Sequence, residues 1–187
     1  MTAEFNESVS SASLVGRLPS IREAFRMAFR SQYRGFFLSR NRFLDKKGLD
    51  GVLVLSGGRR FAVDVKCPTH PTGAEEWALP LETWGCKERG DRGYLLSGGK
   101  ITRYVLWFYP DENWLVLPFR SLAAVMRNHR ENWSRRYRCS SQCTKGHYET
   151  YHSECVVVPA TVVAAAVTEH VRQYQPAFKV RSSLPLN

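Results

Sequence analysis

Apolar residues recur with helical spacing in three parts of the chain. The first part begins at Ser20, where Ser-Ile-Arg-Glu has the form of a capping box, and continues as an apolar stripe. The other two parts, at about residues 119–132 and 159–174, each follow a strand that ends in proline. The pattern predicts three helices, with residues 1–19 as a flexible lead-in.

Short apolar runs with strand character lie between these helices. Residues 51–55 and 61–66 flank Ser56-Gly57-Gly58-Arg59, a strong turn signal, and predict a hairpin. The other strand candidates are residues 79–84, where Pro80 allows an edge strand at best, 104–109, 114–117 and the run ending at Pro159. This order of elements predicts an α/β (α+β) fold with a mixed central sheet flanked by helices.

The length and composition fit one domain. The chain has 187 residues and 43% hydrophobic residues, which is enough for a packed core. We expect the domain to span residues 20–175, with a Cys- and His-rich insertion at about 133–155 and an irregular tail at 176–187.

Positive charge points to a polyanionic partner. Lys and Arg total 27 against 17 Asp and Glu, a formal charge of +10, and phosphate attraction is largely independent of base sequence. We expect DNA as the partner. The candidate phosphate contacts are a stripe on the first helix and a basic cluster after the second: Arg22, Arg26, Arg30, Arg130, Arg135, Arg136 and Arg138. The alternative is an ordinary solvated surface.

The chain carries no membrane-spanning or secretory pattern. No apolar run reaches the length of a transmembrane helix, and the first residues are polar and acidic. Five cysteines, an odd number, also argue against a complete disulfide framework. These features predict a cytoplasmic protein with reduced thiols and no membrane partner.

Two acids and a lysine surround the first hairpin. Asp50 stands at the start of its first strand, and Asp64 and Lys66 stand near the end of its second. Residues two apart in a strand share a face, so Asp64 and Lys66 project together, and the tight turn can bring Asp50 beside them. Two convergent carboxylates suit Mg²⁺, and the lysine can stabilise charge on a reacting phosphate. The alternative is a surface Asp with an ordinary ion pair.

The segment from Asp50 to Lys66 resembles the PD-(D/E)XK nuclease superfamily of restriction enzymes, resolvases and many phage or mobile-element proteins. Asp50 stands at the family's first acid, Asp64 at its second and Lys66 at its lysine. Leu49 replaces the proline of the motif, and Asp64 takes aspartate in place of the commoner glutamate.

The resemblance covers roughly residues 20–130. It implies a restriction-endonuclease-like fold, a four-stranded mixed sheet with flanking helices, and hydrolysis of phosphodiester bonds with Mg²⁺ or Mn²⁺ held by Asp50 and Asp64. It also implies the cytoplasm of a host cell if the protein is phage-encoded.

Family members often add a helical Glu before this hairpin and a polar residue after it. Glu23 is the candidate for the first role, although its place three residues after Ser20 fits a capping partner equally well. Glu82 is the candidate for the second, with a solvent-facing strand residue as the alternative.

Cysteine and histidine are concentrated near residue 150. The candidate ligands are Cys139, Cys143, His147, His152 and Cys155. Thiolates and imidazoles are the ligands that structural Zn²⁺ prefers, but the spacing matches no standard finger. The two readings are a zinc-stabilised loop and a polar loop with free thiols.

Two functions remain in competition. The first is a metal-dependent DNA nuclease, most simply an endonuclease. The alternative is a non-catalytic nucleic-acid-binding protein with a nuclease-like fold and a zinc-stabilised loop. Mimicry of DNA by an inhibitor is disfavoured by the positive charge. The sequence leaves the oligomeric state open, with a homodimer among the assemblies that it allows.

Overall fold

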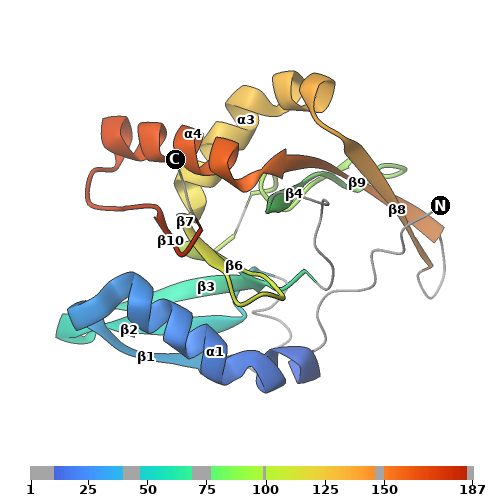
Figure 1. Cartoon of the computed structure of the whole chain (residues 1–187). Helices are drawn as coiled ribbons and strands as arrows, with labels where there is room; N and C mark the ends of the chain where they lie inside the picture. The colour runs from blue at the N-terminus through green and yellow to red at the C-terminus, as the bar shows by residue number, and fades with distance from the viewer. Residues whose placement is uncertain (1–10, 40–46, 69–76, 99, 146–149, 185–187) are drawn as a thin grey trace.

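The computed structural model describes residues 11–39, 47–68, 77–98, 100–145 and 150–184. These residues form two β-sheets and three α-helices (Figure 1). The helices are Ser11–Phe29 (α1), Phe119–Arg136 (α3) and Ala160–Tyr174 (α4). The strands are Tyr33–Leu38 (β1), Gly51–Leu55 (β2), Arg60–Lys66 (β3), Ala78–Cys86 (β4), Asp91–Arg92 (β5), Tyr104–Phe108 (β6), Trp114–Pro118 (β7), Cys139–Lys145 (β8), Thr150–Pro159 (β9) and Arg181–Ser182 (β10). No helix of this described part is long and apolar enough to cross a membrane.

The larger sheet is mixed, as the sequence predicts. Its strand order is β1-β2-β3-β6-β7-β10, and all neighbours are antiparallel except β3 and β6, which are parallel. Gly57 and Gly58 have positive φ angles of 72° and 70° in the turn between β2 and β3, a conformation that glycine adopts without strain. The predicted hairpin and the mixed α+β architecture are both confirmed.

The smaller sheet has the order β5-β4-β9-β8 and is antiparallel throughout. The sequence predicts that Pro80 confines its strand to a sheet edge. Strand β4 has neighbours on both sides, but at Pro80 itself it is paired on one side only. Pro80 pairs with Val157 of β9, while β5 reaches only Trp84 and Cys86 on the other side of β4. The missing N–H of Pro80 therefore costs no ladder hydrogen bond.

Strand β6 shows how the larger sheet is covered on both faces. Its residues alternate between two cores: Val105 and Trp107 pack with α3, α4 and the smaller sheet, whereas Tyr104, Leu106 and Phe108 pack with α1. All five are buried. The arrangement is visible in Figure 1, where α1 lies along one side of the larger sheet and α3 and α4 lie on the other.

The start of the first helix differs from the prediction. Helix α1 begins at Ser11 and includes Pro19, so Ser20 lies inside the helix and is not its N-cap. The Ser20 hydroxyl donates instead to Glu112 Oε1, at 3.1 Å. Leu14 is buried against the core, and this packing extends the helix into the predicted lead-in, through Pro19.

The Cys- and His-rich insertion is not a loop. Helix α3 continues to Arg136, and the segment that follows forms the β8–β9 hairpin. This hairpin is held by pairing with β4, which the local sequence does not reveal. The expected irregular tail also contributes a strand, because β10 pairs with β7 through Arg181 and Ser182.

Candidate active site

Asp64 is a buried acid on a strand whose other residues are largely apolar. Val63 and Val65 pack with α1, so Asp64 and Lys66 project from the opposite face of β3. The Asp64 residue is only 3% exposed. Its Oδ2 lies 3.1 Å from Nζ of Lys66, but it accepts no hydrogen bond of good geometry from any described residue. A buried carboxylate oxygen without a donor is costly, and it is available to a cation.

Asp50 lies beside Asp64 because of the register of the hairpin. Gly51, the first residue of β2, pairs with Val63 of β3. Asp50, one residue before β2, therefore stands opposite Asp64. Two hydrogen bonds fix this position: the Asp50 N–H donates to the Val63 carbonyl at 2.9 Å, and Asp50 Oδ2 accepts the Val65 N–H at 2.6 Å. The predicted approach of the two acids across adjacent antiparallel strands is confirmed.

The ionisation of Asp50 depends on its burial and on its neighbour Asp64. Burial, and then the negative charge of Asp64, raise the pKa of Asp50 to about 8, although the Val65 N–H and the Lys66 charge act in the opposite direction. At neutral pH, Asp50 therefore retains a proton in the protein alone. A divalent cation between the carboxylates would displace that proton, because it supplies the positive charge that the pair lacks.

Lys66 carries the positive charge of the site. Burial acts to lower its pKa, but the charges of Asp64, Asp50 and Glu82 together raise the pKa above its ordinary value. The side chain is 42% exposed, so the ammonium group reaches the pocket while its stem stays in the protein. Lys66 is therefore protonated at neutral pH and acts as a fixed cation rather than a base.

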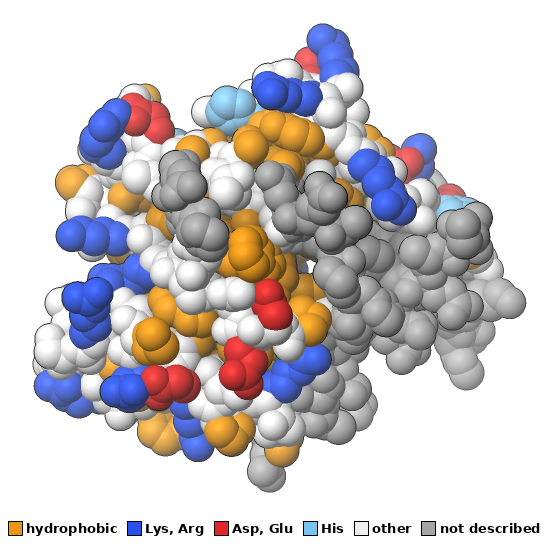
Figure 2. Space-filling view, viewed as in Figure 1, with side chains coloured by type: hydrophobic (Ala, Val, Ile, Leu, Met, Phe, Trp, Pro, Cys, Tyr) orange, Lys and Arg blue, Asp and Glu red, His pale blue; other side chains and the backbone are white. Residues whose placement is uncertain are grey.

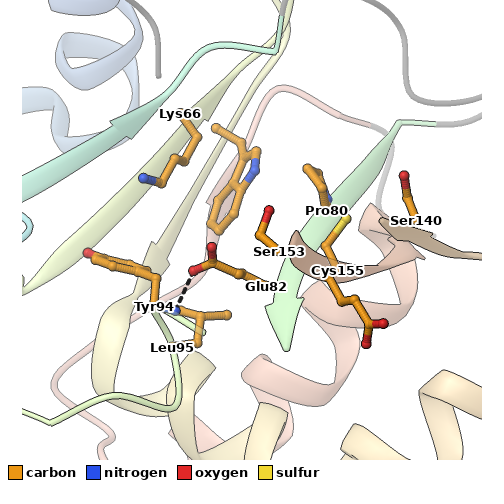
Figure 3. A pocket seen from close by; sticks show the side chains of 10 residues that line it. Lys66, Pro80, Glu82, Tyr94, Leu95, Ser140, Ser153 and Cys155 are labelled. Atoms are coloured by element: carbon orange, nitrogen blue, oxygen red, sulfur yellow. Dashed lines mark hydrogen bonds between the residues drawn. The ribbon is translucent and has the colours of Figure 1, made fainter. Parts of the chain in front are cut away.

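Glu82 reaches the same place from the smaller sheet. Its Oε2 accepts the backbone N–H of Tyr94 at 2.6 Å, and Figure 3 shows its carboxylate directed into the pocket towards Lys66. Gly93 makes this approach possible, since a Cβ there would lie 2.1 Å from the Glu82 carbonyl oxygen. The structure thus brings the predicted Glu82 together with Lys66 across the two sheets.

Tyr94 is a site residue that the sequence reading did not identify. Lys66 Nζ lies 4.8 Å from the centre of its ring, and its hydroxyl is 2.8 Å from Thr102 Oγ1. Thr102 in turn donates to the carbonyl of Gly48, two residues before Asp50, at 2.6 Å. Tyr94 therefore connects Lys66, Glu82 and the segment that leads to Asp50. Its neighbourhood reads as a glycine-rich loop, and no spacing in the sequence marks it.

Lys66, Glu82 and Tyr94 border a pocket of about 210 Å³ between the two sheets. Figure 3 shows Lys66 and Tyr94 on one side of it and the face of the smaller sheet, with Pro80, Ser153 and Cys155, on the other. The lining residues are Lys66, Pro80, Glu82, Tyr94, Leu95, Trp107, Ser140, Ser153, Glu154 and Cys155.

The structure does not bring Glu23, the predicted helical acid, together with Asp50, Asp64 and Lys66. Glu23 lies on the exposed side of α1 in an ion pair with Arg26 Nη2, at 2.5 Å. That ion pair, through its hydrogen bond, lowers the pKa of Glu23. The helix starts earlier than the sequence reading assumed, so Glu23 is neither a capping partner nor a site residue.

The predicted phosphate contacts are distributed over separate surfaces. Arg22 donates to the Phe36 carbonyl and Arg26 pairs with Glu23, so two members of the α1 stripe already have partners. The guanidinium of Arg130 lies 4.9 Å from the Trp84 ring centre, and that of Arg136 lies 5.6 Å from the Tyr137 ring centre. The remaining predicted contacts, Arg30, Arg135 and Arg138, are exposed. Figure 2 shows Lys and Arg side chains in several places on one face rather than in one patch.

The β8–β9 hairpin separates most of the predicted zinc ligands. Cys139 and Cys143 are four residues apart on one strand, about 13 Å, whereas two sulfurs on one Zn²⁺ are at most about 4.6 Å apart. Cys143 does face His152 across the hairpin, but His152 Nδ1 is 2.5 Å from Glu88 Oε1. His147 lies outside the described residues.

A magnesium or manganese ion fits the carboxylate pair. The described residues contain no group of three or more His, Cys, Asp or Glu that could enclose a metal. Mg²⁺ commonly takes only one or two protein carboxylates and completes its shell with water and phosphate oxygens. Asp50 and Asp64 would hold it, and the buried Asp64 oxygen that accepts no hydrogen bond from a described residue is the feature that favours this binding.

Comparison with known proteins adds no relative. No protein-family model, curated protein or solved structure matches this chain significantly.

Proposed function

We propose that this protein is a metal-dependent nuclease of the PD-(D/E)XK type that hydrolyses phosphodiester bonds in DNA. The observation that supports it is the convergence of Asp50, Asp64 and Lys66 at the β2–β3 hairpin of a mixed sheet, where Lys66 also lines a pocket with Glu82. A buried carboxyl such as Asp50, whose pKa is raised by burial and by a neighbouring acid, is uncommon as a purely structural device, because it reduces stability.

Each residue has a role that its position allows. A bound magnesium ion supplies electrophilic activation of the phosphodiester. Asp50 and Asp64 would hold that ion. Lys66 remains protonated beside Asp64 and stabilises the negative charge that develops on the phosphate. Glu82 and Tyr94 fix Lys66 on the side of the pocket.

A cleavage assay tests this function. Purified protein with Mg²⁺ or Mn²⁺ should cut DNA and stop when the metal is chelated. Lys66→Ala should slow turnover by about 100-fold because the developing charge loses its cation, while DNA affinity should change little. Combined Arg135→Ala and Arg136→Ala should weaken binding and reduce its salt dependence.

Binding without cutting would favour the other function. If the wild-type protein binds DNA but does not cut single-stranded, duplex or branched substrates with either metal, it is a non-catalytic nucleic-acid-binding protein. The two outcomes are distinguished in one set of reactions, because binding and product formation are read from the same samples.

A further inference from the structure

The pocket between the two sheets has features beyond those of a phosphodiester site. It extends away from Lys66 over the face of the smaller sheet, where Glu82, Cys155 and Ser140 form a row across β4, β9 and β8. Metal binding and phosphate activation, assigned to Asp50, Asp64 and Lys66, do not use this extension. The volume of the pocket is about 210 Å³.

Beyond Lys66, the described lining residues of the pocket carry no positive charge. Two carboxylates line it, Glu82 and Glu154, and Lys66 stands at its border. The Glu154 carboxylate is paired with Lys87, with Oε1 and Nζ 2.5 Å apart. Burial raises the pKa of the Cys155 thiol to about 11, so that thiol is neutral at pH 7. This part of the pocket therefore offers a phosphate group no cation, and it suits an uncharged group better.

The remaining lining suits a flat, uncharged ring with polar edges. Pro80, Leu95 and Trp107 provide apolar surface, and Ser140 and Ser153 provide hydroxyl groups that can donate or accept hydrogen bonds. Small-molecule sites commonly combine apolar walls with a few polar groups in this way. A single nucleobase matches this description in size and chemistry.

We propose that this pocket receives the base of the nucleotide next to the phosphate that is cut, so that the enzyme acts on DNA in which that base is unpaired. The proposal rests on the nuclease function and specifies its substrate. A base in a duplex is stacked and its edge is hydrogen-bonded, so it must leave the helix to enter the pocket. A single strand or an unpaired position avoids that cost.

Two neighbouring serines of β8 provide a matched test. Ser140 lines the pocket, while Ser141 is exposed and does not. Both serines are on β8, the edge strand of the smaller sheet, which pairs with β9 alone. Ser140→Leu should fill the pocket, and Ser141→Leu is the control. Ser153→Val, on β9, is a second pocket variant if Ser140→Leu fails to fold by circular dichroism.

The first measurement is the cleavage rate with Mg²⁺. The wild-type protein should cut a single strand, or a duplex at one unpaired base, at least about tenfold faster than the fully paired duplex. Ser140→Leu should remove most of that preference, and Ser141→Leu should keep it. Equal rates on paired and unpaired DNA, unchanged by Ser140→Leu, would overturn the proposal while leaving the nuclease function intact.

The second measurement does not depend on cutting. Single-stranded oligonucleotides, each with 2-aminopurine at one position, are bound in the presence of a chelator. At one position the fluorescence should change when the wild-type protein binds, and the change should be lost in Ser140→Leu at equal occupancy. A protein that shows this signal but never cuts would refute the nuclease and retain the base pocket. No position-dependent signal would refute the pocket.

Discussion

Two hairpins of this molecule carry side chains of the kind that bind metals. In β2–β3, Asp50 and Asp64 are fourteen residues apart in sequence but stand opposite each other across two strands. In β8–β9, Cys139 and Cys143 are close in sequence but lie along one strand, about 13 Å apart. The difference shows that metal ligands on a hairpin meet when they stand opposite each other on its two strands. The pairing register decides which side chains meet, whereas closeness in sequence does not.

The largest effect is expected from the Asp64 side chain. Asp64→Asn keeps its shape but removes its charge, and it should reduce metal-dependent cleavage by at least about 100-fold. Steady-state cleavage of a labelled oligonucleotide measures this loss.

The control for that change is Glu23→Gln, an acid on the exposed face of α1. It should cut DNA at the wild-type rate. Wild-type cleavage by Asp64→Asn would show that the carboxylates of the β2–β3 hairpin are not the site.

A second prediction concerns stability without metal. The pKa of Asp50 is raised in the folded protein, so between about pH 4 and pH 8 the folded protein binds more protons than the unfolded chain. The free energy of unfolding therefore falls as the pH rises from about 4 towards 8. Asp50→Asn removes the loss while retaining an oxygen for the Val65 N–H. It should be more stable than the wild type by about 1–2 kcal/mol at pH 8 and show little difference at pH 4.

Thermal melts across this pH range, in the presence of a chelator, make the measurement. The same variant should fail to cut DNA, which would identify the Asp50–Asp64 pair as functional rather than structural. A variant that is less stable than the wild type at pH 8 would show that the two acids do not repel each other as described.

Substitution of Tyr94 should have an intermediate effect on turnover, because Tyr94 contacts both Lys66 and Glu82. Tyr94→Phe keeps the ring under the Lys66 ammonium and loses the hydroxyl with its contact to Thr102, so turnover should fall about two- to fivefold. Tyr94→Leu removes the ring as well and should lower turnover about tenfold. The KM for DNA should change little in either variant, and equal losses in the two would exclude a role for the ring.

The smallest effect is expected in the β8–β9 hairpin. Cys139→Ser and Cys143→Ser should each change the free energy of unfolding by less than about 0.5 kcal/mol, because both side chains are exposed and cannot share one ion in this arrangement. Metal analysis and chemical denaturation of the two variants test this. If both substitutions released one zinc per chain and greatly lowered the free energy of unfolding, the pairing of β8 and β9 described here would be contradicted.

The sequence predicts well what depends on local pattern and poorly what depends on pairing. The turn at Gly57 and Gly58, with apolar runs on either side, is enough to place Asp50 beside Asp64. The start of α1 is missed because Leu14 packs against residues distant in the chain. Tyr94 is missed for the same reason: its partners, Lys66 and Thr102, come from separate segments that only the tertiary fold brings together.

The central claim is that Asp50 and Asp64 together bind one divalent cation, and Mn²⁺ binding followed by electron paramagnetic resonance tests it most directly. The wild-type protein should bind one Mn²⁺ per chain at this site, more tightly at pH 8.5 than at pH 6.5 because the raised pKa of Asp50 makes protons compete with the metal. Asp64→Asn should lose that binding and Glu23→Gln should keep it. Binding that survives in Asp64→Asn, or that is absent from the wild-type protein at both pH values, would contradict the claim.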